Sequence, residues 1–211
     1  MKKKILVAII TTTVSLPTMA EFLGIYAGID YRTTTSSHSN IEGDFRDTNN
    51  LSGYITVEHF VPLIPNAKLK YSDLSAEYSG SQGSNSDSNS SMINAIAYYR
   101  LFNNNLFEFD LGLAYSRIDA VTGRKTDIAQ AYGAVKIHVP GVSTHLFTEV
   151  IAGSINSDEA TDAEMGIAYT FNPDSTLFNF SVRAGYRYQE IRINNATQES
   201  KGLFVGLEAH F

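Results

Sequence analysis

KGLFVGLEAHF, residues 201–211, ends the chain and indicates how the rest of it folds. The odd-numbered positions from 203 onward are apolar: Leu203, Val205, Leu207, Ala209 and Phe211. The even-numbered positions hold Gly202, Phe204, Gly206, Glu208 and His210. Because successive side chains of a strand point to opposite faces, this period of two predicts a β-strand with one apolar face.

The same alternation recurs along the chain and predicts ten strands. They cover residues 22–32, 51–60, 67–78, 92–101, 106–117, 128–139, 144–153, 163–171, 177–193 and 202–211. Short turns such as Pro140-Gly141 alternate with longer polar loops. The longer predicted loops include 33–50, the Gly/Ser/Asn-rich segment 79–91, the acidic stretch with Asp158, Glu159 and Asp162, and 194–201. This order predicts an all-β fold, an antiparallel up-and-down transmembrane β-barrel with short turns at one end and long loops at the other.

Residues 1–20 have the pattern of a secretory signal peptide. Lys2, Lys3 and Lys4 precede an apolar run, and small residues at Thr18 and Ala20 suit cleavage after Ala20. The apolar run is far shorter than the ~20 residues of a membrane-spanning helix. We therefore expect a mature chain of residues 21–211 that forms one barrel domain.

Composition excludes several classes of function. The expected mature chain has 13 Lys+Arg against 22 Asp+Glu, a net charge of −9, because the three leading lysines are lost. Such a chain is a poor candidate for a basic, phosphate-facing nucleic-acid surface. Cysteine is absent, which excludes disulfides and thiolate metal sites. No later segment reaches ~18 consecutive apolar residues, so a chain of this kind would cross a bilayer only as a closed barrel.

One face of the predicted strands carries charges of both signs. Its acidic residues are Asp30, Glu58, Glu108, Asp110, Glu149, Glu164 and Glu208, and its basic residues are Arg32, Lys68, Lys70, Arg100, Lys136, Arg183 and Arg187. Seven of each make this face nearly neutral, and we expect all fourteen to line the lumen. If they pair, they form a polar plug, whereas water between them would leave a narrow passage.

The opposite face is apolar and carries two groups of aromatic residues. Near the predicted turns lie Tyr99, Phe107, Phe109, Tyr169, Phe178, Phe180 and Phe211, and near the predicted loops lie Tyr31, Tyr115, Tyr186 and Tyr188. Two aromatic girdles around an aliphatic band suit a lipid-facing surface. A soluble ligand-binding β-barrel, which has the same period with its apolar side inward, is the alternative.

Four segments carry a resemblance to a known family. EFLGIYAGIDYR (21–32), TVEHFVPLIPNAKLKYSDLS (56–75), FEFDLGLAYSR (107–117) and GLFVGLEAHF (202–211) together resemble small outer-membrane β-barrel proteins of Gram-negative bacteria whose function is uncharacterised. The resemblance implies location in the bacterial outer membrane and brings no catalytic residues.

The C-terminal strand also resembles the signal by which outer-membrane barrels are recognised and inserted. Its signal positions are Leu203, Val205, Leu207, Ala209 and Phe211. The expected partners are therefore outer-membrane lipid and lipopolysaccharide, and the barrel-assembly machinery during insertion. The oligomeric state is left open.

Two glycine pairs and three histidines remain. Gly24 with Gly28, and Gly202 with Gly206, lie on the two strands that would meet when the barrel closes, which favours close packing at that seam over free lumen space. His138, His145 and His210 fall on the inward face near the turns. Two facing histidines without a carboxylate at a defined spacing are a weak metal signal, so we expect no metal and no cofactor.

We find no convergent nucleophile, base and orienting acid, and Ser37-His38-Ser39 falls in a predicted loop. The sequence therefore predicts a non-enzymatic barrel with a narrow or closed lumen and a structural or loop-presenting role. The alternatives are a narrow pore for small solutes and, less favoured, a barrel enzyme.

Overall fold

The computed structural model describes residues 23–39, 44–61, 63–79, 85–88, 90–120, 125–175 and 178–211, and these residues form β-strands, turns and irregular chain. The strands are β1 Leu23–His38, β2 Asp44–Arg46, β3 Thr48–His59, β4 Asn66–Asp73, β5 Ala76–Ser79, β6 Asn85–Ser88, β7 Ser91–Asn103, β8 Phe107–Asp119, β9 Lys125–His138, β10 Thr144–Ile155, β11 Asp158–Phe171, β12 Asn179–Ile193 and β13 Ala196–His210. In this part of the chain no helix is long and apolar enough to cross a membrane. The predicted signal peptide, residues 1–20, lies outside the described residues.

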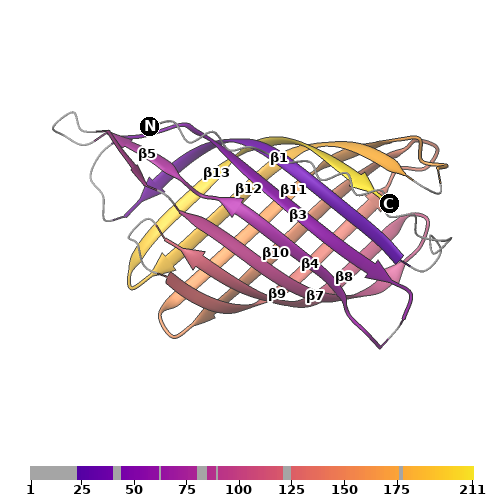
Figure 1. Ribbon diagram of the computed structural model, residues 1–211, viewed down its shortest axis with the longest axis horizontal. Coiled ribbons are helices and arrows are strands. Elements are labelled where there is room, and N and C mark those ends of the chain that lie inside the picture. Colours follow the sequence, from indigo (N-terminus) through magenta and orange to yellow (C-terminus); the bar gives the residue numbers. More distant parts are fainter. Residues whose placement is uncertain are drawn as a thin grey trace, which may run out of the picture.

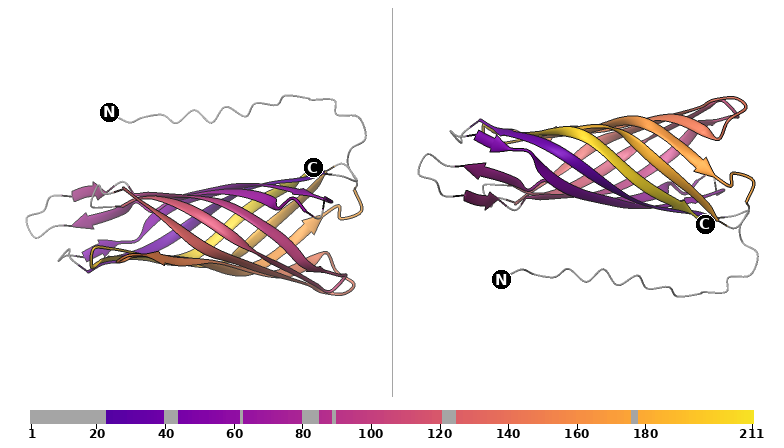
Figure 2. Two further views of the ribbon diagram at one scale, coloured as in Figure 1. Left: turned by 90° about the horizontal axis from the view of Figure 1, so that it is seen from below. Right: turned by 90° about the horizontal axis from the view of Figure 1, so that it is seen from above.

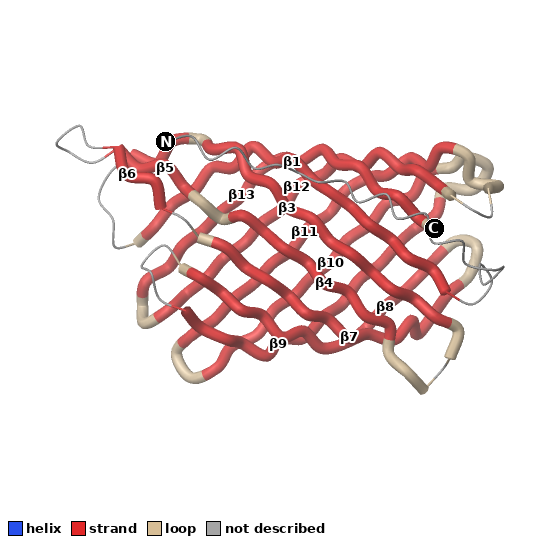
Figure 3. The backbone as a smooth tube through the Cα atoms, in the orientation of Figure 1, coloured by secondary structure: helices blue, strands red, loops and turns tan. Residues whose placement is uncertain are grey.

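Ten of these strands close into an antiparallel barrel, which confirms the predicted fold (Figure 1). Their order is β1-β13-β12-β11-β10-β9-β8-β7-β4-β3, and β1 pairs with both β13 and β3. The first and last strands therefore form the closing seam, where Ile29 lies opposite Leu207. The strands run obliquely to the long axis, as a tube through the backbone shows (Figure 3).

The two ends of the barrel differ. The end with the β3–β4, β7–β8, β9–β10 and β11–β12 connections, where the chain ends at Phe211, is called the turn end below. At the opposite end, the loop end, β5 pairs with β2 and β6 in a separate three-stranded sheet. This small sheet extends beyond the barrel rim (Figure 2).

The prediction of loops at 33–50 and 79–91 was wrong in part. β1 continues to His38, and β2, the start of β3 and β6 occupy much of the rest. The polar residues that suggested loops still alternate: Thr34 and Ser36 are buried while their neighbours Thr33 and Thr35 are exposed. Outside a lipid layer both faces of a strand can be polar, so loss of the apolar face does not mark the end of a strand.

Two other predicted loops are two-residue turns. β10 and β11 are joined by Asn156-Ser157, and β12 and β13 by Asn194-Asn195. Asn156, Asn194 and Asn195 have φ angles of 55°, 48° and 65°. Asparagine adopts this left-handed conformation more readily than other non-glycine residues, and a turn with two such residues suits the strand twist of a hairpin.

The third predicted strand also ends earlier than expected. The chain bends after Asp73, whose carboxylate Oδ1 accepts hydrogen bonds from Ser75 N at 2.9 Å and Ser75 Oγ at 2.6 Å. Leu74 turns inward and is buried, and its amide donates to Ser90 O at 2.9 Å. This bend separates the barrel strand β4 from β5 of the small sheet.

The outer surface of the barrel is apolar along its middle. Large side chains that face outward there are about half exposed or more, including Ile29, Ile55, Leu69, Leu113, Met165 and Leu203. Aromatic rings contact one another near the turn end, as in Phe171 with Phe180 at 5.8 Å and Phe178 with Phe211 at 5.2 Å. This is the reverse of a soluble ligand-binding barrel, whose apolar side chains face inward.

Exposed ion pairs follow directly on this apolar surface toward the loop end. Arg117 pairs with Asp127 at 3.0 Å, Lys125 with Asp119 at 3.1 Å, and Arg192 with Glu159 at 3.0 Å. Tyr115, the last outward aromatic residue of β8, is only two positions from Arg117. The outer surface thus changes from apolar to charged between two successive outward-facing residues of one strand.

Candidate functional site: the charged lumen

The inward faces of the ten barrel strands place all fourteen predicted charged residues inside the barrel. Most contact an oppositely charged side chain, either on a neighbouring strand or across the lumen. Together with Asp162, which was not among the fourteen, they form a central cluster, a rim cluster near the turn end, and three residues that belong to neither.

The central cluster consists of eight charged residues, namely Asp30, Lys68, Lys70, Glu149, Asp162, Glu164, Arg183 and Arg187. Four are acidic and four basic, so the cluster is neutral. Lys70 Nζ lies 2.7 Å from Glu149 and 2.9 Å from Glu164, and Lys68 also contacts Glu149. Arg183 is 2.7 Å from Glu164 and 3.2 Å from Asp30. Charges removed from water are tolerated only when partners of this kind surround them.

Arg187 is the most deeply enclosed member of the central cluster. Only 1% of its surface is exposed, and it donates to both carboxylate oxygens of Asp162, at 2.8 Å and 2.5 Å. A second contact, to Ser72 Oγ at 2.6 Å, ties it to the opposite wall. Because arginine matches a carboxylate with two parallel hydrogen bonds, the pair fixes the Arg187 side chain against the neighbouring strand β11, and the Ser72 contact carries it across the lumen.

The rim cluster surrounds Arg100. Its guanidinium group lies 2.5 Å from Glu58, 3.0 Å from Asp110 and 3.5 Å from Glu108. Glu108 also contacts His138 Nε2 at 2.8 Å. The rim cluster therefore holds three carboxylates around one guanidinium group, and Arg100, Glu58 and Glu108 are more exposed than the members of the central cluster.

Arg32, Lys136 and Glu208 stand outside both clusters. Arg32 is buried toward the loop end and donates to Gln189 Oε1 at 2.5 Å. Lys136 lies 5.4 Å from the centre of the Tyr26 ring. Glu208 accepts a hydrogen bond from the Tyr54 hydroxyl.

An apolar layer fills the lumen between the central cluster and the loop end. It consists of Leu74, Met92, Ile118, Ala120, Ile128, Ala160, Ile191 and Ile193, none more than 6% exposed. This layer was not predicted from the sequence, because its residues occupy inward positions that were expected to be polar. The alternation of inward and outward positions could have revealed it, because Ile118 and Ile128 continue the inward-facing series of their strands.

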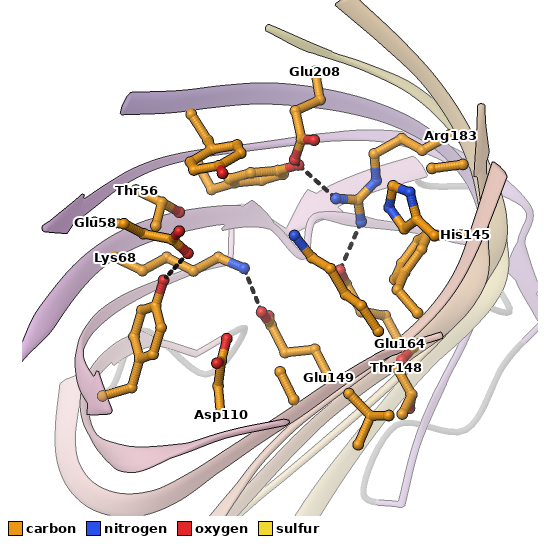
Figure 4. A pocket seen from close by; sticks show the side chains of 18 of the residues that line it. Thr56, Glu58, Lys68, Asp110, His145, Thr148, Glu149, Glu164, Arg183 and Glu208 are labelled. Atoms are coloured by element: carbon orange, nitrogen blue, oxygen red, sulfur yellow. Dashed lines mark hydrogen bonds and ion pairs between the residues drawn. The ribbon is translucent and has the colours of Figure 1, made fainter. Parts of the chain in front are cut away.

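A chamber remains at the turn end. One cavity of ≈370 Å³ lies at the mouth, and a smaller one of ≈70 Å³ lies deeper, against Lys68, Glu149, Glu164 and Arg183. Figure 4 shows Arg183, Glu208 and His145 directed into this space, with Lys68 reaching toward Glu149. The central cluster therefore forms the floor of the chamber.

Asp162 was misassigned by the sequence analysis. It was predicted to lie in an acidic loop with Asp158 and Glu159, but β11 begins at Asp158, and Asp162 is buried beside Arg187. The inward series Ala160, Asp162 and Glu164 has the correct spacing, so the phase of the strand carried this information. Asp158 accepts a hydrogen bond from Thr126 at 2.8 Å, and Glu159 pairs with Arg192.

The histidines and the glycines occupy their predicted strands. His138 lies directly opposite His145, with ring centres 5.7 Å apart, and His210 stacks on Tyr26 at 4.1 Å. Among the described residues no three metal-ligating side chains converge. Gly202 and Gly206 permit close contact at the seam, because a Cβ on either would overlap the β1 strand at Thr33 O or Asp30.

Ser37 and His38 were predicted to lie in a loop, but they belong to β1, where they lie opposite Glu199 and Gln198. Partial burial lowers the pKa of the His38 imidazole.

The strand pairing and the lumen define a closed ten-stranded β-barrel with a charge-paired interior. No protein-family model and no curated protein matches the chain. Among solved structures, it is similar to Neisserial surface protein A, with 17% identity over 87% of this chain and 95% of that chain and a TM-score of 0.40. It is also similar to the toluene transporter TodX of Pseudomonas putida (9% identity, 92% and 90% covered, TM-score 0.42) and to the monoaromatic hydrocarbon channel CymD (10%, 90% and 69%, 0.41). The fold assignment rests on this chain's own strand pairing.

Proposed function

We propose that this protein is an integral outer-membrane β-barrel with a closed lumen, which serves a structural or loop-presenting role. The observation that carries this proposal is the central cluster. Arg187, Lys70 and Asp162 are each at most 2% exposed, although they lie where a channel would hold water. Side chains that line an aqueous passage keep exposed surface, so these side chains support a barrel that is shut at its middle.

The outer surface supports the membrane location. Its apolar band is bordered by aromatic rings, as a lipid-facing surface requires, and a soluble protein would leave this band in contact with water. In this arrangement the turn end faces the periplasm and the small sheet at the loop end faces outward. Outer-membrane lipid and lipopolysaccharide are then the surrounding partners, and the barrel-assembly machinery acts on the C-terminal strand.

The decisive experiment is single-channel recording on residues 21–211, refolded and inserted into planar bilayers. We expect no discrete conductance steps from folded, inserted protein. A 16-stranded porin in the same bilayers is the positive control, because barrels of that size hold an aqueous channel. Insertion of the test protein is verified separately by co-flotation with lipid vesicles.

Reproducible openings would contradict the closed lumen and favour the alternative, a narrow pore for small solutes. In that case neutralising Arg183 or Arg187 should change the ratio of cation to anion permeability, because both side chains would line the conducting path. The proposal includes no catalytic activity.

A further inference from the structure

The chamber at the turn end is lined by charged groups whose bonding capacity is not used up. Its two cavities share Tyr26, Lys136, His145, Ser181 and Glu208 as lining residues, and so adjoin one another. Val142 and Pro173, from two different turns, lie at its mouth. Because the central cluster closes its floor, the chamber is a blind site open toward one side of the membrane.

Lys136 is the lumenal cation with the fewest partners. Among the described residues it forms no ion pair; its Nζ lies 5.4 Å from the centre of the Tyr26 ring, and Glu108 is its cross-strand neighbour on β8. An ammonium group has three hydrogen-bond donors, so Lys136 can still bind an acceptor. Lys68, Lys70, Arg100, Arg183 and Arg187, by contrast, each contact at least one carboxylate.

Glu208 is the complementary case. It accepts a hydrogen bond from the Tyr54 hydroxyl but, within the described chain, forms no ion pair with a lysine or arginine. It lines both cavities, as Lys136 does. The same space therefore offers one ammonium group and one carboxylate that lack a direct ionic partner.

This pair of charges selects among ligand classes. A simple anion at Lys136 would face Glu108 and Glu208, which line the same cavity. A simple cation at Glu208 would face Lys136. A small molecule with both charges meets an opposite charge at each end, which lowers the cost of removing all four groups from water.

We propose that the chamber binds a small zwitterion of the amino-acid type, with its carboxylate at Lys136 and its ammonium group at Glu208. The cavity of ≈370 Å³ is at the lower end of the range for small-molecule pockets, which suits a ligand of few heavy atoms. The stacked rings of Tyr26 and His210, 3° from parallel, form a flat wall for its apolar part.

The test compares three probes of similar size: alanine, propionate and propylamine. Each is titrated into residues 21–211 folded in detergent micelles, and binding is measured by saturation-transfer NMR. We expect alanine to bind about tenfold more tightly than either singly charged probe, as the loss of one charged hydrogen bond implies.

Two variants reverse the preference in opposite directions. Lys136→Met keeps the length of the side chain and should shift binding toward propylamine, while Glu208→Gln should shift it toward propionate. Each should weaken alanine binding about tenfold. Lys201→Met, at an exposed lysine on the outer face of β13, is the matched control and should bind alanine as the unmodified protein does.

Three results overturn the proposal. Absence of an alanine signal from protein with intact β-sheet circular dichroism means that the chamber holds only water. Equal binding of alanine and propionate that persists in Glu208→Gln means a plain anion site. Unchanged alanine binding in both variants means that the ligand sits elsewhere. The measurement is independent of whether the barrel conducts.

Discussion

Arg187 shows at the scale of one residue how a barrel interior can be charged and still stable. Removing a guanidinium group from water costs several kcal/mol unless its donors are satisfied. Here Nε and Nη2 donate three hydrogen bonds, two to Asp162 and one to Ser72, while Nη1 has no hydrogen-bond partner among the described residues. The side chain also joins β12 to β4, strands that are not neighbours in the sheet, so it links opposite walls.

Replacing Arg187 with methionine should destabilise the barrel by ~3–5 kcal/mol, because Asp162 is left as a buried charge without its main partner. Arg192→Met, which removes an exposed pair with Glu159, should cost less than ~1 kcal/mol. Urea unfolding in lipid vesicles, followed by circular dichroism, measures both. The double variant Arg187→Met, Asp162→Asn should recover part of the loss, and similar costs for the two single arginine variants would contradict the account.

Gly202 tests the closing seam. A Cβ at this position would overlap the carbonyl group of Thr33 on β1, so Gly202→Ala should separate β13 from β1 and cost ~1–3 kcal/mol. Gly133→Ala is the matched control, since its Cβ would meet only Asp110 O, at 4.0 Å. Unfolding midpoints of the two variants give the comparison. If Gly202→Ala is as stable as Gly133→Ala, the glycine does not limit the seam.

At the scale of secondary structure, alternation located all ten barrel strands but not their outer ends. The apolar face disappears where the strands leave the lipid-facing region, so β1 could not be followed beyond Arg32 although its inward Thr34 and Ser36 are buried. The Asn194-Asn195 turn was predicted as part of a longer loop at 194–201, although two consecutive asparagines suit a two-residue turn. The small sheet was not, because its strands are short and polar and pair with segments far away in sequence.

The β5–β6 hairpin should be dispensable for the barrel, because its ladder contacts belong to the separate sheet. Replacing residues 77–88 with a short Gly-Ser linker should leave the urea midpoint unchanged. If the protein presents its loops, the same variant should lose binding to a cell or external partner. The replacement stops before residues 90 and 91, because Ser90 Oγ donates a hydrogen bond to Asp119 O and Ser91 begins β7. A large loss of stability would show that the sheet supports the barrel.

At the scale of the whole molecule, the lumen has three layers: the chamber, the central cluster and the apolar layer. The strand phase predicted the direction of the charged residues, but pairing across the lumen depends on barrel diameter and strand stagger, which one strand does not contain. For the same reason Leu74, Met92 and Ile128, from three separate strands or bends, could not be recognised as one cluster.

The C-terminal residue is considered at this scale because we propose that it is recognised during assembly of the barrel. Phe211 pairs through its backbone with Ile25, and its ring contacts Phe178 at 5.2 Å. Deleting Phe211 should strongly reduce the amount of protein in the outer membrane of cells while leaving detergent refolding largely intact. Leu106→Ala, an exposed apolar residue in the β7–β8 turn, is the control. Equal amounts of the two variants in outer-membrane fractions would contradict a role of Phe211 in insertion.

On the outer face the surface changes from aromatic at Tyr115 to charged at Arg117. In a lipid bilayer this boundary would also set the depth to which the barrel is inserted. Two residues of strand span only ~7 Å, so sliding the molecule by that distance along the membrane normal would immerse an ion pair in hydrocarbon or strip an aromatic ring of lipid. The same boundary recurs around the circumference at Lys125 and Arg192. In the proposed membrane position the barrel would therefore resist both vertical displacement and tilting, and the small sheet would stay at a constant height above the lipid.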